Sequence, residues 1–285
     1  MNVSVPQLRA FLAVVDEGGF GAAAVRLGIS QSAVSHAVSA LERALDGPVL
    51  ERAGRARATA FGERIMPAAR EMVGAAARIE RLADHRDGQP AGTVRLGAPP
   101  TACQGLLPGL LARWRTELPR VDVELFEGED DEVAGWLASG TVDLAVLVDA
   151  PPARGVTLAE DAFCALLRRD HPLAAEPAVE VAELADDPFL LSRGGCERHV
   201  RRMHRTAGVP FAPAHRVREM GTLLAMVRAG VGVSIVPDLA GAMLDATLTL
   251  VPVRPRRTRR LVLAGHDHAP PAAAAVLALA RSATR

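Results

Sequence analysis

The sequence predicts an α/β protein with an all-α N-terminal part, arranged as a winged helix-turn-helix, a long linker helix and a two-lobed C-terminal domain. Two short helical patterns meet at Gly28, an apolar heptad runs over 65–83, and strand-like and helix-like segments alternate from Thr93 onward. The predicted domain ranges are 1–59 for the winged helix-turn-helix, 60–90 for the linker helix and hinge, and 91–285 for the two-lobed domain.

The length and charge of the chain restrict how it could bind a polyanion. Its 285 residues are enough for two or three domains, each with a core. Its 33 basic and 33 acidic residues give a formal net charge of zero. Because no global field attracts nucleic acid, any DNA binding depends on local placement of charge.

The segment over 20–45 has the pattern of a helix-turn-helix. Gly28 suits the left-handed conformation that ends a helix, and Ser30 suits the N-cap of the next one. The second helix carries an apolar stripe, made of Val34, Val38, Leu41 and Leu45. Small polar residues lie off this stripe, which is typical of a DNA-reading helix. An ordinary helical hairpin is the alternative.

A supporting helix and a basic wing flank this pair. Pro6 suits the first turn of a helix that extends to Gly18. The segment over 49–59 predicts a short two-stranded wing that carries Arg52, Arg55 and Arg57. Such arginines contact phosphates or enter a minor groove, and a solvated loop is the alternative.

A long helix follows the wing and predicts self-association. Thr59 caps it, and it runs to about Asp87. Its heptad seam consists of Ile65, Ala69, Met72, Ala76, Ile79 and Ala83. Self-pairing of this seam predicts a dimer, and packing against the same chain is the alternative. The segment over 88–92 predicts a hinge.

The rest of the chain predicts two α/β lobes with a cleft between them. Expected strands are 93–98, 121–126, 143–148, 163–167, 188–191, 217 and 231–236, and expected helices are 106–114, 133–137, 196–207, 222–229 and 272–280. The first lobe is expected at about 91–162 and 265–285, and the second at about 163–264. The cleft should lie at the carboxyl ends of the strands, where helix N-termini and loops meet a ligand.

Cysteine usage and hydropathy predict a soluble cytoplasmic protein. Cys103, Cys164 and Cys196 are too few and too scattered for a secreted disulfide framework. Neither a signal peptide nor an apolar run of the roughly 20 residues needed for a membrane span is evident. We therefore expect no membrane partner.

These residues together resemble the LysR-type transcriptional regulators. The matching motifs are Phe11-Leu12-Ala13-Val14, Ala23-Ala24 with Leu27-Gly28, Ser30-Gln31-Ser32-Ala33-Val34-Ser35 with Leu41-Glu42, Leu50-Glu51-Arg52, Thr59 with Gly62-Glu63-Arg64, Gly140 with Asp143-Leu144-Ala145, His171-Pro172-Leu173-Ala174, and Ala229-Gly230-Val231-Gly232 with Pro237. The resemblance implies a periplasmic-binding-protein-like effector domain, dimers that pair into tetramers, and binding of double-stranded promoter DNA that a small molecule modulates.

The resemblance also implies a DNA-contacting set, with the second helix in the major groove. Its members are Ser30, Gln31, Ser32, Ser35, His36, Arg52, Arg55 and Arg57. His36 departs from the family pattern, in which Arg is common, and this departure leaves the base preference at that contact open.

For the effector, the resemblance points to three loops of the cleft. The candidate residues are Thr101, Ala102, Cys103, Cys196, Glu197, Gly221 and Thr222. Thr101 and Thr222 place hydroxyls beside helix N-termini, which suits an anionic effector. The alternative is that both hydroxyls simply cap helices.

Cys196 supports an alternative mechanism, thiol or redox sensing. A helix start lowers a thiol pKa, and peroxide-sensing members of the family carry their reactive cysteine near this position. Cys103 would then face it across the cleft. More remote alternatives are a solute-binding protein and a cysteine hydrolase with His199 or His204 as base. We expect no enzyme activity and hence no catalytic residue, cofactor or metal site.

Overall fold

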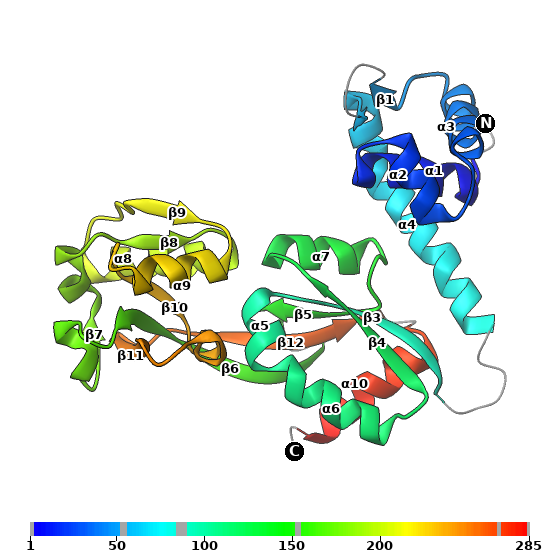
Figure 1. Ribbon diagram of the computed structural model, residues 1–285. Helices are drawn as coiled ribbons and strands as arrows, with labels where there is room; N and C mark the ends of the chain where they lie inside the picture. Colours follow the sequence, from blue (N-terminus) through cyan, green and yellow to red (C-terminus); the bar gives the residue numbers. More distant parts are fainter. Residues whose placement is uncertain (1–2, 52–55, 84–89, 152–154, 267–268, 284–285) are drawn as a thin grey trace. The chain divides into compact units, whose positions relative to one another are not determined.

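The computed structural model describes residues 3–51, 56–83, 90–151, 155–266 and 269–283 (Figure 1). The chain forms two compact units, one of Met1–Gly88 with Ala138–Thr141, and one of Gln89–Leu137 with Val142–Arg285. The predicted hinge over 88–92 and the predicted end of the linker helix fall partly outside the described residues. Each unit is described by itself.

The first unit contains the predicted winged helix-turn-helix. Its elements are α1 (Val5–Glu17), α2 (Phe20–Leu27), α3 (Gln31–Leu45), β1 (Leu50–Glu51), β2 (Arg57–Ala58) and α4 (Ala60–Ala83). Gly28 ends α2 with φ of 64°, and the Ser30 hydroxyl accepts from the Ala33 N–H at 3.2 Å. Val34, Val38 and Leu41 of the predicted stripe are buried against α1. The helix-turn-helix prediction is thus confirmed.

The rest of the first unit covers only part of the apolar seam of the linker helix α4. Thr59 caps it, accepting from the Gly62 N–H at 3.0 Å. Ala69 is buried in the core of the first unit, whereas Met72 and Ile79 are 41% and 69% exposed. Packing on its own unit therefore accounts for Ala69 and leaves Met72 and Ile79 exposed.

The first lobe of the second unit is a sheet covered on both faces. Its strands are β3 (Gly92–Ala98), β4 (Val121–Glu127), β5 (Leu144–Val148) and β12 (Thr258–Gly265), in the order β4-β3-β5-β12. Its helices are α5 (Pro100–Gly105), α6 (Leu107–Glu117), α7 (Asp130–Ala138) and α10 (Pro271–Ala283). Helices α6 and α10 pack on one face and α7 on the other (Figure 1).

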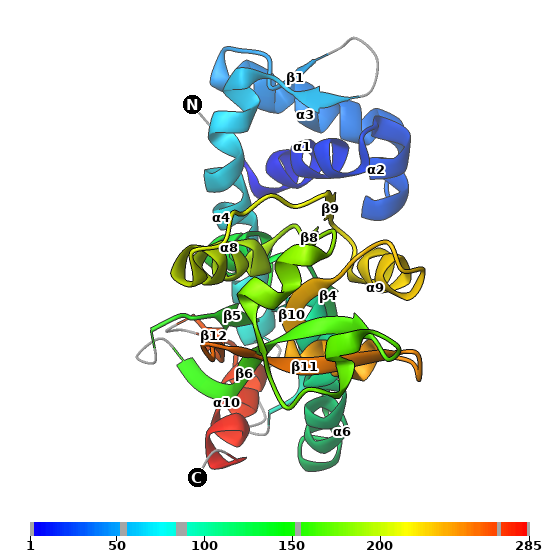
Figure 2. The same ribbon diagram turned by 90° about the vertical axis from the view of Figure 1, so that its left-hand side faces the viewer.

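The second lobe continues from β6 (Gly155–Arg168), a strand that pairs with both lobes. Its further elements are η2 (Pro172–Ala175), β7 (Val179–Glu180), η3 (Val181–Asp186), β8 (Leu190–Ser192), α8 (Gly195–Ala207), β9 (His215–Val217), α9 (Met220–Arg228), β10 (Ser234–Pro237), η4 (Asp238–Met243) and β11 (Leu248–Arg254). Helices α8 and α9 lie on opposite sides of β8, β9 and β10 (Figure 2). The successive residues Leu190 and Leu191 of β8 point to opposite faces, so Leu191 packs in the core that contains α8 and Leu190 in the core that contains α9.

Two features differ from the sequence-based expectation. Strands β11 and β12 had no helix between them to mark them as α/β units, and they were not predicted. Strand β12 is antiparallel to β5 and β6, so the sheet is mixed and the chain re-enters the first lobe at Thr258. Among the described helices, none is long and apolar enough to cross a membrane.

Candidate functional site

Helix α3 presents an exposed polar face in the first unit. Gln31, Ser35 and His36 are exposed on it. Ser30 and Ser32, also exposed, lie with their hydroxyl oxygens 2.9 Å apart. A shallow hollow beside this face is lined by the turn between α1 and α2, the first residue of α2, α3 and the wing. The face therefore offers short hydrogen-bonding side chains to an external partner.

The wing is held to the same helix by a hydrogen bond. Glu42 of α3 accepts from the Val49 N–H at 3.0 Å through Oε1. Gly62 permits a close approach of α4, since a Cβ there would lie 2.2 Å from the Val49 carbonyl oxygen. Arg57 is exposed on β2, whereas Arg52 and Arg55 lie outside the described residues. Sequence reasoning did not identify Glu42 as the residue that positions the wing.

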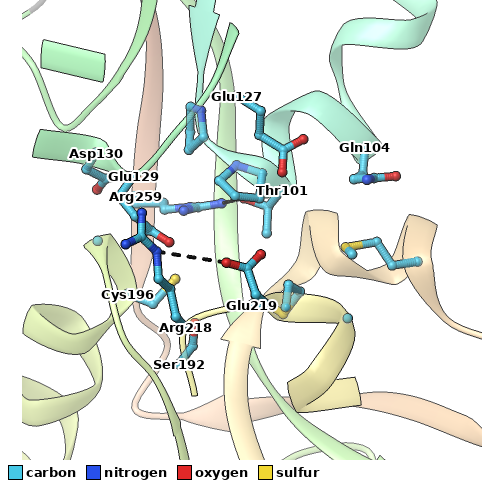
Figure 3. A pocket seen from close by; sticks show the side chains of 16 residues that line it. Thr101, Gln104, Glu127, Glu129, Asp130, Ser192, Cys196, Arg218, Glu219 and Arg259 are labelled. Atoms are coloured by element: carbon cyan, nitrogen blue, oxygen red, sulfur yellow. Dashed lines mark hydrogen bonds and ion pairs between the residues drawn. The ribbon is translucent and has the colours of Figure 1, made fainter. Parts of the chain in front are cut away.

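A cavity of about 250 Å³ lies between the two lobes of the second unit (Figure 3). Its walls come from the loops that precede α5, α7, α8 and α9, together with η4 and β12. The lining residues are Pro99, Pro100, Thr101, Gln104, Glu127, Glu129, Asp130, Ser192, Gly195, Cys196, Arg218, Glu219, Met220, Gly221, Met243 and Arg259.

A buried ion pair forms one wall of the cavity. Arg259 donates to Asp161 through Nε and Nη2, at 2.9 and 2.7 Å, and both side chains are almost fully buried. Nη2 of Arg259 also donates to the Thr101 hydroxyl at 2.6 Å. Asp161 accepts in addition from the Leu239 N–H. Arg259 is therefore neutralised inside the protein before any ligand enters.

The N-terminus of α8 meets carboxylates from the other lobe. A Cβ on Gly194 would lie 1.8 Å from Oε2 of Glu129, and one on Gly195 would lie 1.9 Å from Oδ2 of Asp130. The Gly195 N–H donates to Glu129, and Arg198 of α8 pairs with Asp130 at 3.4 Å. The two glycines thus leave the space in which Glu129 and Asp130 cover this helix end.

Burial makes these carboxylates harder to ionise. Desolvation raises the pKa of Glu129, against the lowering effect of the hydrogen bond from the Gly195 N–H, and the neighbouring Asp130 raises it further. Desolvation also raises the pKa of Asp130, against the lowering effect of Arg259 and Arg198. Desolvation is thus the main reason that both carboxyl groups ionise less readily than in water.

The candidate effector residues divide into two groups. Thr101, Cys196 and Gly221 line the cavity. The others do not: Ala102 is fully buried in the core of the first lobe, Cys103 donates to the Ala98 carbonyl, Glu197 pairs with Arg201 and Arg216, and Thr222 is exposed. In a short helix such as α5, only one side of the first turn faces the cleft.

The expected thiolate at Cys196 is wrong for this structure. Cys196 is 8% exposed, and burial raises the pKa of its thiol to about 11. The desolvation of the thiolate outweighs the attraction of the helix start and of Arg259. Burial also raises the pKa of Cys103 to about 12, and that residue lies outside the cavity lining.

The two histidines of the hydrolase alternative are buried and already have partners. Burial lowers the pKa of His199 to about 4. Its Nε2 lies 3.2 Å from Nε of Arg198, which donates to it, and 3.4 Å from Asp149. Burial also lowers the pKa of His204, whose Nδ1 lies 3.0 Å from the Val200 carbonyl oxygen. Within the described ranges, no group of three or more His, Cys, Asp or Glu residues is arranged to hold a metal.

Sequence reasoning missed the charged residues of the cavity. Glu129 and Asp130 belong to an acidic run directly after a predicted strand, and this position was a usable signal. Arg259 lies on β12, which sequence reasoning did not predict, and its partner Asp161 is 98 residues away. Only the folded chain brings them together.

A winged helix-turn-helix joined by a long helix to a two-lobed domain with an interlobe cavity defines a class of DNA-binding regulators. The family model described as LysR substrate binding domain matches residues 87–285, and the model described as bacterial regulatory helix-turn-helix protein, lysR family, matches residues 5–63. The chain belongs to the LysR family of transcriptional regulators.

Relatives and solved structures agree with this assignment. YvbU, an uncharacterized HTH-type transcriptional regulator of Bacillus subtilis (strain 168), is 30% identical over 241 residues, which are 84% of this chain and 82% of YvbU. A full-length OxyR variant from Pseudomonas aeruginosa has a TM-score of 0.69 at 26% identity, covering 98% of each chain. CbnR, a LysR family transcriptional regulator, has a TM-score of 0.74 at 24% identity, covering 99% of each chain, and a full-length CbnR structure contains its target DNA.

Proposed function

We propose that this LysR-family regulator binds promoter DNA sequence-specifically through α3 and its wing, and that a small molecule in the interlobe cavity modulates this binding. The observation that carries the proposal is the exposed polar face of α3, held beside the wing by Glu42. The CbnR complex with target DNA supports it, because that protein has the same fold. The proposed DNA contacts are Ser30, Gln31, Ser32, Ser35, His36, Arg52, Arg55 and Arg57.

The test of DNA reading uses the full chain on duplexes selected from a random pool. Ser35→Arg places a long side chain on the reading face, and we expect at least a ten-fold loss of affinity in a mobility shift at fixed salt. Ser282→Arg adds the same charge to an exposed position of α10 and should leave affinity unchanged. Equal affinity of wild type and Ser35→Arg would remove α3 from the interface.

The exposed part of the α4 seam supports self-association. Met72 and Ile79 present apolar side chains that the first unit does not cover. We propose that they pair with a second copy of the chain to give a dimer, and that dimers associate further into tetramers. Ile79→Glu should shift the sedimentation coefficient toward the monomer. Val231→Glu, at an exposed apolar position of the second lobe, is the matched control.

Thiol sensing at Cys196 is a second candidate, supported by the likeness to OxyR. The raised pKa of the Cys196 thiol opposes it, because the thiolate is the species that reacts with peroxide. We therefore expect hydrogen peroxide to leave the DNA affinity of the wild type unchanged. A peroxide response that Cys196→Ser abolishes would establish thiol sensing instead.

A further inference from the structure

The charges that line the cavity are mostly negative. Four carboxylates, two guanidinium groups and several apolar groups form its wall. Of the guanidinium groups, Arg259 is already neutralised by Asp161 at 2.7 Å, and Arg218 pairs with Glu132 at 3.2 Å and with the lining residue Glu219 at 3.9 Å (Figure 3). The four carboxylates are Glu127, Glu129, Asp130 and Glu219. Asp130 pairs with Arg198 at 3.4 Å and Glu219 with Arg218 at 3.9 Å, so the uncompensated negative charge of the wall comes mainly from Glu127 and Glu129.

The helix end that would attract an anion is already covered. The N-terminus of α8 carries partial positive charge, which makes it an anion site in principle. Glu129 and Asp130 lie against it, within the space that a Cβ on Gly194 or Gly195 would need. An anionic ligand would have to displace these two carboxylates from Gly195 and Arg198.

Deepening the proposed function, and resting on it, we infer that the effector of this cavity is a small organic cation, a protonated amine or guanidinium with a short apolar body. The acidic wall supplies acceptors for its N–H groups. Pro99, Pro100, Met220 and Met243 supply an apolar wall for its carbon skeleton. This inference replaces the anionic effector that Thr101 and Thr222 suggested.

Two further observations limit the ligand class. Neither these carboxylates nor any other described residues form a cluster suited to a metal ion, which favours an organic cation. The volume of about 250 Å³ limits the ligand to a small molecule. Burial keeps the pKa of Glu129 and of Asp130 raised, and a cation bound beside them would lower both again.

The test compares probes that differ only in their charged group. Calorimetric titration of the full chain uses n-butylammonium, n-butylguanidinium, n-butyrate and n-butanol. We expect each cation to bind at least ten-fold more tightly than butyrate or butanol. Glu127→Gln and Glu129→Gln should each weaken cation binding about five-fold or more. Glu176→Gln removes an exposed carboxylate outside the cavity and should change nothing.

A variant with an obstructed cavity tests whether the cation binds in the cavity. Gly221 lines the cavity, and a Cβ on it has no heavy atom within 4 Å, so we choose Gly221→Trp to obstruct the cavity, with its fold checked by circular dichroism. It should abolish cation binding, and binding that survives it overturns the inference. Butyrate binding as tightly as the cations, with loss in Gly221→Trp, overturns the cationic class and leaves the cavity as an effector site. Absence of binding by every probe also overturns the inference, while DNA reading is judged by the separate mobility shift.

Discussion

Helices α3 and α8 differ in the groups that cover their N-terminal ends. Ser30 caps α3 from within its own segment, and the exposed face that follows makes few contacts with the rest of the unit. The N-cap of α8 is Gly194, which has no side chain, and carboxylates of the other lobe approach it instead. A locally capped helix remains available to an external partner, whereas a ligand at α8 must compete with the protein itself.

The histidines near the start of the two helices show the same contrast. His36 of α3 is exposed. His199 of α8 is 3% exposed, stacks on Phe163 with ring centroids 5.0 Å apart, and lies 3.4 Å from Asp149. His36 is accessible to an external partner, whereas His199 is part of the packing between elements. The following predictions test this contrast, beginning with the largest expected effect.

Removing the partner of Arg259 should destabilise the second unit most. Asp161→Ala leaves a guanidinium group with 2% exposure and no carboxylate, and a broken buried ion pair costs about 3–5 kcal/mol of unfolding free energy. Both tryptophans, Trp114 and Trp136, lie in the second unit, so urea unfolding followed by their fluorescence reports on it.

The control for this variant is the exposed pair of Arg168 and Asp170. Asp170 is 65% exposed, and Asp170→Ala should leave the unfolding free energy nearly unchanged, because water screens an exposed ion pair. If Asp161→Ala changed the unfolding free energy as little as Asp170→Ala, the stability of the second unit would not depend on the buried ion pair.

Acid should weaken the packing of α8 through His199. The pKa of this residue is about 4 in the folded chain, below its ordinary value of 6.5, because burial disfavours the charged ring. As the pH falls, the unfolded chain takes up the proton before the folded chain does. The contribution of His199 to the unfolding free energy is therefore fully present above pH 6.5 and is lost as the pH falls toward 4, by up to about 3 kcal/mol. Urea unfolding of the wild type and of His199→Gln, measured at pH 7.0 and pH 4.5, isolates this contribution.

Comparing His199→Gln with the wild type controls for the other groups whose pKa values are shifted, because both chains contain these groups. The raised pKa values of Glu129 and Asp130 act in the opposite direction and favour the folded state as pH falls. The lowered pKa of His204 acts in the same direction as that of His199. If both chains lost equal stability between the two pH values, the buried ring of His199 would not be the cause.

Gly194 should tolerate substitution less well than Gly221. Gly194 has φ of 116°, and a Cβ there would lie 1.8 Å from Oε2 of Glu129, so Gly194→Ala should cost about 1–3 kcal/mol. Gly221 lies in the first turn of α9 with open space around it, and Gly221→Ala should be neutral or stabilise the helix by up to about 1 kcal/mol. Similar unfolding free energies for the two variants would contradict the covered helix end.

The same contrast explains which parts of the structure could be predicted from the sequence. Gly28, Ser30 and the stripe of α3 act over a few residues, so their spacing was enough to predict the helix-turn-helix. The thiol of Cys196 was misjudged because burial, the main cause of its raised pKa, and the nearby carboxylate of Asp130 depend on parts of the chain that lie far away in the sequence. Local sequence patterns predict the environment of a helix start correctly only where residues that are distant in the sequence do not contact it.

Ser30→Ala should have the smallest effect and confine it to the first unit. The loss of the hydrogen bond from the Ala33 N–H to the Ser30 hydroxyl should cost about 1 kcal/mol. Amide hydrogen exchange without DNA should show faster exchange in the first turn of α3, and the tryptophan-detected unfolding of the second unit should stay unchanged. Ser39→Ala, in the interior of the same helix, should leave the exchange of that turn as in the wild type. Equal exchange in the two variants would mean that α3, like α8, is held at its start by more than its own cap.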